Sequence, residues 1–228
     1  MKKIIIITVA VVACLVTLSV LLWLNRTPTQ NNTTVKPMDN AMHTGAVVRA
    51  FGLDKPYSPY NQQNLIKQLD YLKELGASDS RANAEIDMTV NDDFVRLSLE
   101  RSLTPTLILE PPQSASGNVY NLMYAYAQRV ATRFNGKVDY YQLGNEASGV
   151  AIKPGFPGNK VTDYDETKYL QLKDMLKGLS DGVRAGDSDA QRIISSNWLG
   201  VGVMDRLISD KVDFEIFLWV SIKIILKL

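Results

Sequence analysis

Cysteine and histidine are almost absent from this chain of 228 residues, which has one of each. The single cysteine, Cys14, excludes an internal disulfide framework, and His43 cannot form a metal site by itself. The 25 lysines and arginines nearly balance the 24 aspartates and glutamates, so the net charge of +1 gives no electrostatic basis for binding nucleic acid. We therefore expect no metal, no other cofactor and no nucleic-acid partner, and we expect neither Cys14 nor His43 to be catalytic.

Two motifs of other parallel α/β enzymes are also missing from the sequence. There is no glycine-rich phosphate loop of the expected form and no serine in a nucleophile elbow. A different parallel α/β enzyme of one of these kinds is therefore the most distant alternative.

The sequence has a long apolar run near the N terminus. Lys2 and Lys3 precede the uncharged, mostly apolar segment Ile4–Leu24, which at about 1.5 Å per residue spans a hydrocarbon core of about 30 Å. The run ends without the small residues of a signal-peptidase site, which favours an uncleaved signal anchor over residues 1–26. Because the positive charges come first, we expect a cytoplasmic N terminus and a domain outside the cytoplasm, at the cell surface, in the periplasm or beyond.

A lipoprotein signal is the alternative for this segment, because Val11–Cys14 formally resembles a lipobox. The apolar run continues after Cys14, which argues against cleavage there. Residues 27–44 are rich in Asn, Thr and Pro without periodicity, so they predict a polar, solvated linker. The folded domain is then expected over residues 45–228.

Within that domain, strand-like and helix-like segments alternate, which is typical of parallel β/α architecture. Strands are predicted over 46–51, 77–83, 106–109, the first half of 137–149, 192–196 and 212–217. Apolar residues recur at helical spacing over 65–75, 94–99, 119–134, 169–183 and 207–208. Asn91 is expected to cap the second helix, and Gly76 to end the first.

The most informative segment is Lys137–Gly149, with the sequence KVDYYQLGNEASG. It begins as a buried strand, and Gly144 allows a sharp turn that places Glu146 on the rim beside Asn145. A carboxyl group kept protonated there by partial desolvation can give its proton to a leaving oxygen, while Asn145 can donate a hydrogen bond to a sugar hydroxyl. Taken alone, Gly-Asn-Glu also fits a turn followed by the start of a helix.

A hydrophobic strand followed by Gly-Asn-Glu resembles strand four of the large clan of retaining glycoside hydrolases built on (β/α)8 barrels. The resemblance runs from Gly45 to Phe217 in the order and spacing of the elements, although only Asn145 and Glu146 form a specific motif. It implies that Glu146 is the general acid/base and that Asn145 binds substrate.

Two more site residues follow from the same resemblance. Segment 77–83 is similar to the clan's second strand, which ends with an arginine near the catalytic carboxylates, here Arg81. Segment 106–112 is similar to its third strand, which gives Glu110 a substrate-binding or supporting role. Asp87, in the loop after the second strand, is expected to be a solvated carboxylate.

Two aromatic residues are candidates for stacking on sugar rings, whose apolar faces suit π systems. Trp198 follows the fifth predicted strand, where a buried core tryptophan is equally compatible with the sequence. Phe156 lies in the Gly- and Pro-rich loop 151–161, as either a sugar platform or an ordinary loop residue.

The pattern departs from the clan after the fifth unit. Clan members carry a His and a Tyr around the tryptophan that ends strand six, whereas Trp219 is flanked by Leu218 and Val220. Their nucleophilic Glu comes from strand seven, which the sequence does not contain. A whole barrel takes about 250 residues and the segment from Gly45 offers about 184. We therefore expect a partial (β/α)8 TIM barrel of five to six β/α units.

The tail, residues 221–228, lacks turn residues and a helix cap, which predicts a frameshift or premature stop near Phe217. Unpaired edge strands then predict marginal stability. The sequence as a whole predicts a membrane-anchored retaining glycoside hydrolase for polysaccharide or oligosaccharide, present as a truncated and inactive fragment. The alternative is a non-catalytic, membrane-tethered carbohydrate-binding or scaffold protein.

Overall fold

The computed structural model describes residues 45–47, 61–85, 88–110, 118–196, 201–214 and 216–219. The chain divides into two units, Met1–Asp39 and Asn40–Leu228, and the described residues all belong to the second. The predicted signal anchor and linker lie outside them. In the part of the chain that is described, no helix combines the length and the apolar character needed to cross a bilayer.

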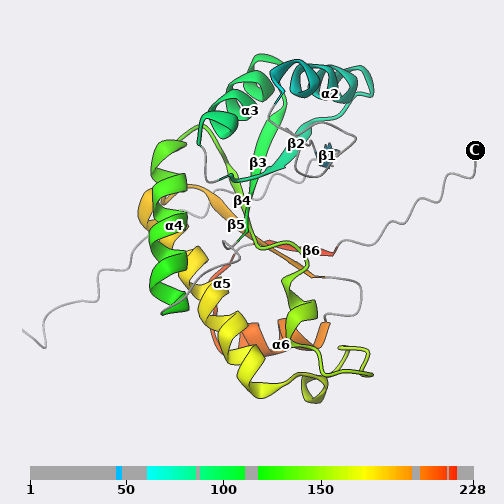
Figure 1. Cartoon of the computed structure of the whole chain (residues 1–228), viewed down its shortest axis with the longest axis vertical. Helices are drawn as coiled ribbons and strands as arrows, with labels where there is room; N and C mark the ends of the chain where they lie inside the picture. Colours follow the sequence, from blue (N-terminus) through cyan, green and yellow to red (C-terminus); the bar gives the residue numbers. More distant parts are fainter. Residues whose placement is uncertain are drawn as a thin grey trace, which may run out of the picture. The chain divides into compact units, whose positions relative to one another are not determined.

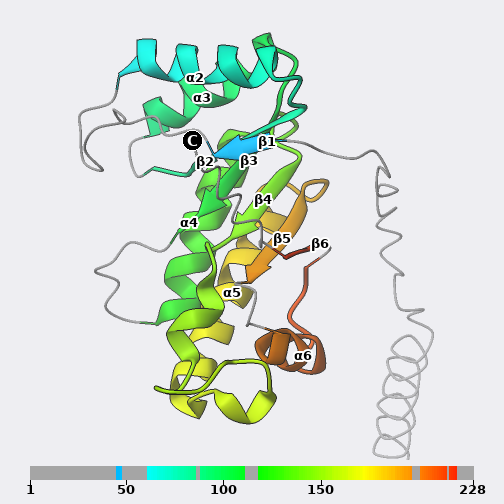
Figure 2. The same ribbon diagram turned by 90° about the vertical axis from the view of Figure 1, so that its right-hand side faces the viewer.

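Six parallel strands form one sheet in the order in which they occur along the chain (Figure 2). They are β1 (Gly45–Val47), β2 (Asp79–Asn83), β3 (Thr104–Leu109), β4 (Tyr140–Leu143), β5 (Gln191–Ser196) and β6 (Ile216–Trp219). Because every neighbouring pair is parallel, all carboxyl ends of the strands lie at the same edge of the sheet. The predicted α/β class with a parallel sheet is confirmed.

A helix follows each of the first five strands (Figure 1). These are α2 (Gln62–Glu74), α3 (Met88–Glu100), α4 (Val119–Arg133), α5 (Glu166–Gly186) and α6 (Val201–Ser209), with short 3₁₀ turns η1 (Ala147–Ala151) and η2 (Val161–Asp163) before α5. Their apolar residues pack with alternate strand residues such as Leu107, Tyr141 and Leu143 in the main core. Ile108 and Ile193 are buried outside this core, so they belong to the other face of the sheet.

The predicted end of the first helix is confirmed at Gly76. Its φ of 74° is left-handed, its N–H bonds the carbonyl of Lys73 at 3.0 Å, and the N–H of Ala77 bonds that of Leu72 at 2.9 Å. These two bonds satisfy helix-end carbonyls as in a Schellman motif. Leu75, predicted on the apolar face, is 82% exposed because the chain already turns there.

Helices α4 and α5 lie side by side in both views (Figures 1 and 2), and glycines set their distance. A Cβ added at Gly182 would lie 2.4 Å from the carbonyl oxygen of Tyr124, and one at Gly178 would lie 2.5 Å from that of Tyr120. Gly186 makes a similar approach to α4. The four-residue spacing of these glycines along α5 therefore lets the two backbones touch.

Two predicted boundaries are wrong. Asn91 does not cap α3, which begins at Met88; its buried side chain instead accepts from the N–H of Glu85 at 3.0 Å and donates to the carbonyl of Asn83 at 3.1 Å. The sixth strand begins at Ile216 and not at Val212. The N–H of Val212 donates to the carbonyl oxygen of Leu207 at 3.0 Å, so Val212 still closes the end of α6.

Candidate functional site

A buried polar network lies where β2, β4 and β5 approach their carboxyl ends. Gln142 of β4 is fully buried and accepts a hydrogen bond from Nη1 of Arg81 at 2.7 Å. Its Nε2 donates to the carbonyl oxygen of Gly144 at 2.8 Å and to Oγ of Ser195, also buried, at 2.9 Å. Three strands distant in sequence are therefore joined through one amide.

The turn that follows β4 rests on this network. Gly144 has a φ of 72° and Glu146 a φ of 48°, both left-handed. The N–H of Glu146 donates to Oγ of Ser195 at 3.1 Å, and that hydroxyl donates to the carbonyl of Gly144 at 3.3 Å. Oδ1 of Asn145 accepts from Nε2 of Gln142 at 3.3 Å. The side chains of Asn145 and Glu146 remain exposed. The buried network therefore supports a turn whose carboxyl and amide groups face solvent.

The backbone of Glu146 is the unusual part of this turn. Residues other than glycine, asparagine and aspartate seldom adopt the left-handed backbone conformation. Holding such a residue there costs on the order of 1 kcal/mol or more. The hydrogen bond from Glu146 N–H to Ser195 offsets part of that cost. Strained residues of this kind cluster at functional sites.

Arg81 and Glu146 interact through their charges. Burial of the guanidinium lowers the pKa of Arg81, and the negative charge of Glu146 acts in the opposite direction. The fold therefore brings together three of the residues singled out by the sequence, namely Arg81, Asn145 and Glu146. It does so through Gln142 and Ser195, which the sequence analysis missed.

Glu110, directly after β3, belongs to a second acidic group at the same edge of the sheet. It is exposed and accepts a hydrogen bond from Nδ2 of Asn83 at 3.2 Å. Burial raises the pKa of the half-buried Glu85, and the charge of Glu110 adds to that rise. Glu85 was not singled out by the sequence analysis, and its position two residues after β2 is the signal that was available.

Two predicted residues, Asp87 and Trp198, lie outside the described residues, and Trp219 is described only in its backbone. Phe156 is 52% exposed in the loop before α5, with Nζ of Lys153 5.8 Å from its ring centroid. Within the described ranges, no group of three or more His, Cys, Asp or Glu residues is arranged to hold a metal ion.

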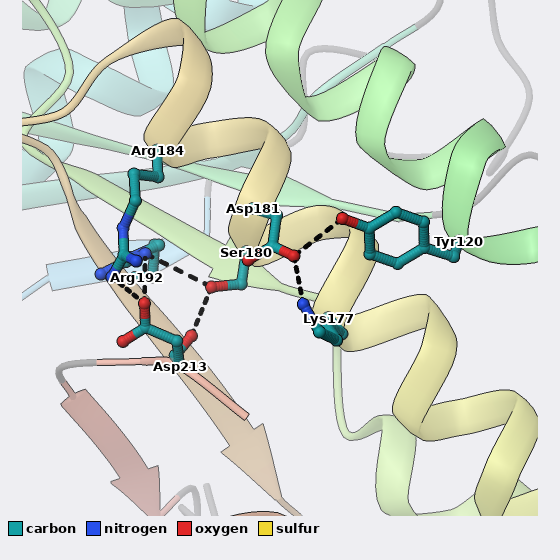
Figure 3. Close-up of polar contacts among 7 residues, drawn as sticks. All are labelled: Tyr120, Lys177, Ser180, Asp181, Arg184, Arg192 and Asp213. Carbon is teal, nitrogen blue, oxygen red and sulfur yellow. Dashed lines mark hydrogen bonds and ion pairs between the residues drawn. The ribbon is translucent and has the colours of Figure 1, made fainter. Parts of the chain in front are cut away.

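A separate charged cluster lies at the amino end of the sheet (Figure 3). The Arg192 side chain, 4% exposed, contacts Oδ2 of Asp213 at 3.2 Å and Oγ of Ser180 at 3.4 Å, and Arg184 pairs with the same carboxylate. Burial lowers the pKa of Arg192 to about 10. These contacts join the start of β5 to α5 and to the segment before β6, away from the carboxyl ends of the strands.

The neighbouring half of this cluster joins α4 to α5. The hydroxyl of Tyr120 donates to Asp181 at 2.8 Å, and Lys177 pairs with the same carboxylate (Figure 3). Nζ of Lys177 also lies 5.3 Å from the centroid of the Tyr120 ring. These contacts flank the close approach of the two helices.

Part of the fold is similar to solved (β/α)8 glycoside hydrolases. A GH53 catalytic domain from Ignisphaera aggregans is 18% identical over 67% of this chain and 51% of its own, with a TM-score of 0.49. A family 1 β-glucosidase from Thermotoga maritima is 15% identical over 57% of this chain and 36% of its own, with a TM-score of 0.45. The virulence factor SghA, solved with its substrate analogue salicin, is 15% identical over 60% and 37%, with a TM-score of 0.47.

The chain therefore spans between about a third and a half of the length of these solved proteins. At these identities and TM-scores, the likeness concerns the fold and carries nothing about activity. No protein-family model and no curated protein matches the sequence.

Proposed function

We propose that the chain carries the acid/base half of a retaining glycosidase site, with Glu146 as the proton donor. The observation that supports this is the buried Arg81–Gln142–Ser195 network, which presents Asn145 and Glu146 to solvent at the carboxyl end of β4. In parallel β/α folds, ligands bind at this end of the strands. The substrate class is a β-linked polysaccharide or oligosaccharide.

The proposed chemistry assigns one role to each exposed group. Glu146 protonates the glycosidic oxygen as the bond to the anomeric carbon breaks. Asn145 donates a hydrogen bond to a hydroxyl of the sugar, and Arg81 places a positive charge beside Glu146. Glu110 is proposed to bind the substrate further along the same edge, and Trp198 is proposed to bind it as well.

A retaining reaction also needs a nucleophilic carboxylate about 5 to 5.5 Å from the acid. Glu110 and Glu85 are other carboxylates at this edge, but both follow strands on the β2–β3 side, and Glu110 already accepts from Asn83. We assign neither as the nucleophile. We therefore propose that this chain alone does not hydrolyse glycosides, in keeping with a fragment of a retaining enzyme.

Azide tests the assignment of Glu146, because it can act in place of a nucleophilic carboxylate. We expect the full chain with an aryl β-glycoside and sodium azide to form the α-glycosyl azide, since azide attacks opposite the leaving group. Glu146→Gln should slow this reaction about 10²- to 10⁴-fold for a phenol leaving group, and far less for a dinitrophenol, which needs no proton. Glu74→Gln, which changes an exposed carboxylate on α2, should keep the wild-type rate. Equal rates for wild type and Glu146→Gln with the phenol would refute the assignment.

A carbohydrate-binding protein without catalysis is the second candidate. Phe156 favours it, because the loop holds this ring exposed and is itself ordered by hydrogen bonds such as Gly158 N–H to buried Asp163 at 3.1 Å. Here we expect no glycosyl azide, but oligosaccharide binding that Glu146→Gln preserves and Phe156→Ala weakens. Calorimetric titration with β-linked oligosaccharides distinguishes the two candidates.

We also propose that residues 1–26 anchor the chain in a membrane, with the domain on the extracytoplasmic side. Expressed in bacteria, the full chain should sediment with membranes and need detergent for release, whereas a chain beginning at residue 27 should not. Cys14→Ser separates the two forms of anchor. It should leave the length of a signal anchor unchanged, whereas a lipoprotein would lose its lipid and its cleavage before Cys14 and accumulate as the longer precursor.

A further inference from the structure

We propose that Gln142 and Ser195 are positioning residues that fix the backbone of Glu146 and the direction of the Asn145 amide. The consequence for sugar binding rests on the proposed function, whereas the positioning itself does not. Neither side chain is exposed, so both act through the two residues that face solvent.

The orientation of the Gln142 amide is determined from both of its ends. The guanidinium of Arg81 can only donate, so the atom of Gln142 that faces it at 2.7 Å is the oxygen. The carbonyl of Gly144 can only accept, so the atom that faces it at 2.8 Å is the nitrogen. A flipped amide would place two donors together and two acceptors together, which makes the flipped form unfavourable in a buried site.

The direction of Asn145 follows from that of Gln142. Nε2 of Gln142 can only donate, so the atom of Asn145 that lies 3.3 Å from it is Oδ1, the most distant of three acceptors that share its two N–H groups. Nδ2 of Asn145 then points away from the network and offers its N–H groups to solvent. The site therefore presents a donor at this position, and the sugar group that meets it must accept, as the oxygen of a hydroxyl does.

Ser195 replaces backbone pairing at the point where β4 turns away. The register of β4 with β5 runs to Gln142 opposite Ile193, and Ser195 lies two residues further along β5. Its hydroxyl accepts from Nε2 of Gln142 and from the N–H of Glu146, and donates to the carbonyl of Gly144. A hydroxyl has one donor and two acceptor sites, so all three are used. The Ser195 hydroxyl thus fixes the backbone of Glu146 in its left-handed conformation. A hydrogen bond between neighbouring strands fixes the backbone of an extended residue in the same way.

Amide hydrogen exchange of the full chain tests the positioning without any substrate. Ser195→Ala should speed exchange of the Glu146 N–H about tenfold, while the N–H of Gly144, bonded to the carbonyl of Leu109 at 3.0 Å, keeps its rate. Ser195→Thr retains the oxygen and should retain slow exchange. Ser98→Ala is the matched control, because it removes another buried serine hydroxyl, 2.9 Å from Oγ of Ser80. Unchanged exchange at Glu146 in Ser195→Ala would overturn the proposal.

Gln142→Met provides a second variant if Ser195→Ala does not fold. It removes the amide at nearly the same volume, so exchange at Glu146 should again rise, and Gln142→Glu should have the same effect because a carboxylate cannot donate to Gly144. Wild-type exchange in both variants would also overturn the proposal.

The azide reaction then measures the effect on the reacting group. Ser195→Ala should lower kcat about tenfold with KM within about twofold, and Ser195→Thr should restore it; a loss equal to that of Ser98→Ala would indicate a structural role only. If wild type forms no glycosyl azide and binds no sugar, the proposed function fails while the exchange result still decides the positioning. If the azide reaction succeeds but exchange at Glu146 is unchanged, only the positioning fails.

Discussion

Glu146 is held in a conformation that costs it stability, with φ at 48° and ψ at 34°. Glycine reaches this region without a clash of Cβ, whereas alanine does not. We predict that Glu146→Gly is more stable than Glu146→Ala by about 1 kcal/mol, as measured from urea midpoints. Both variants lack the carboxyl group, so their difference isolates the backbone. Equal stabilities would show that the turn relaxes to another conformation once the side chain is removed.

Glu85 provides a prediction on pH at the same edge of the sheet. Its folded pKa lies above the ordinary 4.5 because of burial and then the charge of Glu110. Between pH 4.5 and that raised value the folded state binds more protons than the unfolded state, so stability falls as pH rises through this window. Glu85→Gln should therefore be more stable than wild type at pH 7 and no more stable below pH 4.

Thermal midpoints from about pH 3.5 to 7.5 test this prediction, with Glu74→Gln as the control for removing one negative charge from an exposed site. A Glu85→Gln curve parallel to that of wild type would contradict it.

At the residue level, the sequence predicted the exposed half of the site and missed the buried half. Glu146 and Asn145 were singled out because they follow a strand and a glycine and resemble a motif of the clan, and their roles in chemistry stay predictions. Gln142 and Ser195 were overlooked because a polar residue within a strand shows its partner only when the neighbouring strand is known. Buried polar groups require such partners, so each polar residue inside a predicted buried strand was a usable signal.

At the level of elements, helix propensity and close packing have opposite effects on a substitution of glycine where α5 contacts α4. Helix propensity alone would make Gly182→Ala stabilising by about 0.5 to 1 kcal/mol. The new Cβ would lie 2.4 Å from a backbone carbonyl and 2.9 Å from Cβ of Ala127, which forces the helices apart. We predict that packing prevails and that Gly182→Ala destabilises the protein by about 1 to 3 kcal/mol.

Denaturant unfolding measures the sign of this change. Ala185→Leu is the control, because it adds volume to an exposed position of α5 and should stay within about 0.5 kcal/mol of wild type. A stabilising Gly182→Ala would show that the helices are not held in contact at this point.

Helix positions were predictable because apolar spacing repeats over many residues: α5 covers its predicted range, and α2 and α4 each end one residue before theirs. The start of α3 was not, because Asn91 fits a cap by type but is used to bond the loop after β2. The glycines of α5 were visible in the sequence, but which helix they approach depends on the order of the strands.

At the level of the whole molecule, one polar cluster surrounds Gln142 at the carboxyl end of the sheet and another surrounds Arg192 at the amino end. Asp213→Asn takes the carboxylate from buried Arg192 and should cost roughly 2 kcal/mol, less than a fully buried pair because the Asp213 side chain is 40% exposed. Arg184→Ala, which removes a 51% exposed partner, should cost at most about 1 kcal/mol. Asp213→Asn should leave exchange at Glu146 unchanged.

The double variant Asp213→Asn/Ser195→Ala tests the independence of the two ends. Its loss of stability should equal the sum of the single losses within about 0.5 kcal/mol. A larger deviation would mean that β5 transmits strain between the clusters.

The sheet order was predictable because a strand, a helix and another strand in sequence pack as neighbouring parallel strands. The register of the strands was not predictable, since the relative shift of parallel strands depends on how the connecting helices pack on the sheet. The start of β6 was misplaced because Val212 still closes the end of α6, although the existence of the strand was predicted.

The loop before α5 is closed at its base, where Ile152 and Tyr164 form an antiparallel bridge and the N–H of Lys153 bonds Asp163 at 2.9 Å. The ends of the loop are thus already held together by contacts that do not involve its tip. Doubling the length of such a tip costs only about 0.6 kcal/mol of closure entropy. Only the turn over residues 154–157 is accordingly exchangeable for a longer or differently shaped peptide, because Gly158 and Lys160 are bonded to Asp163.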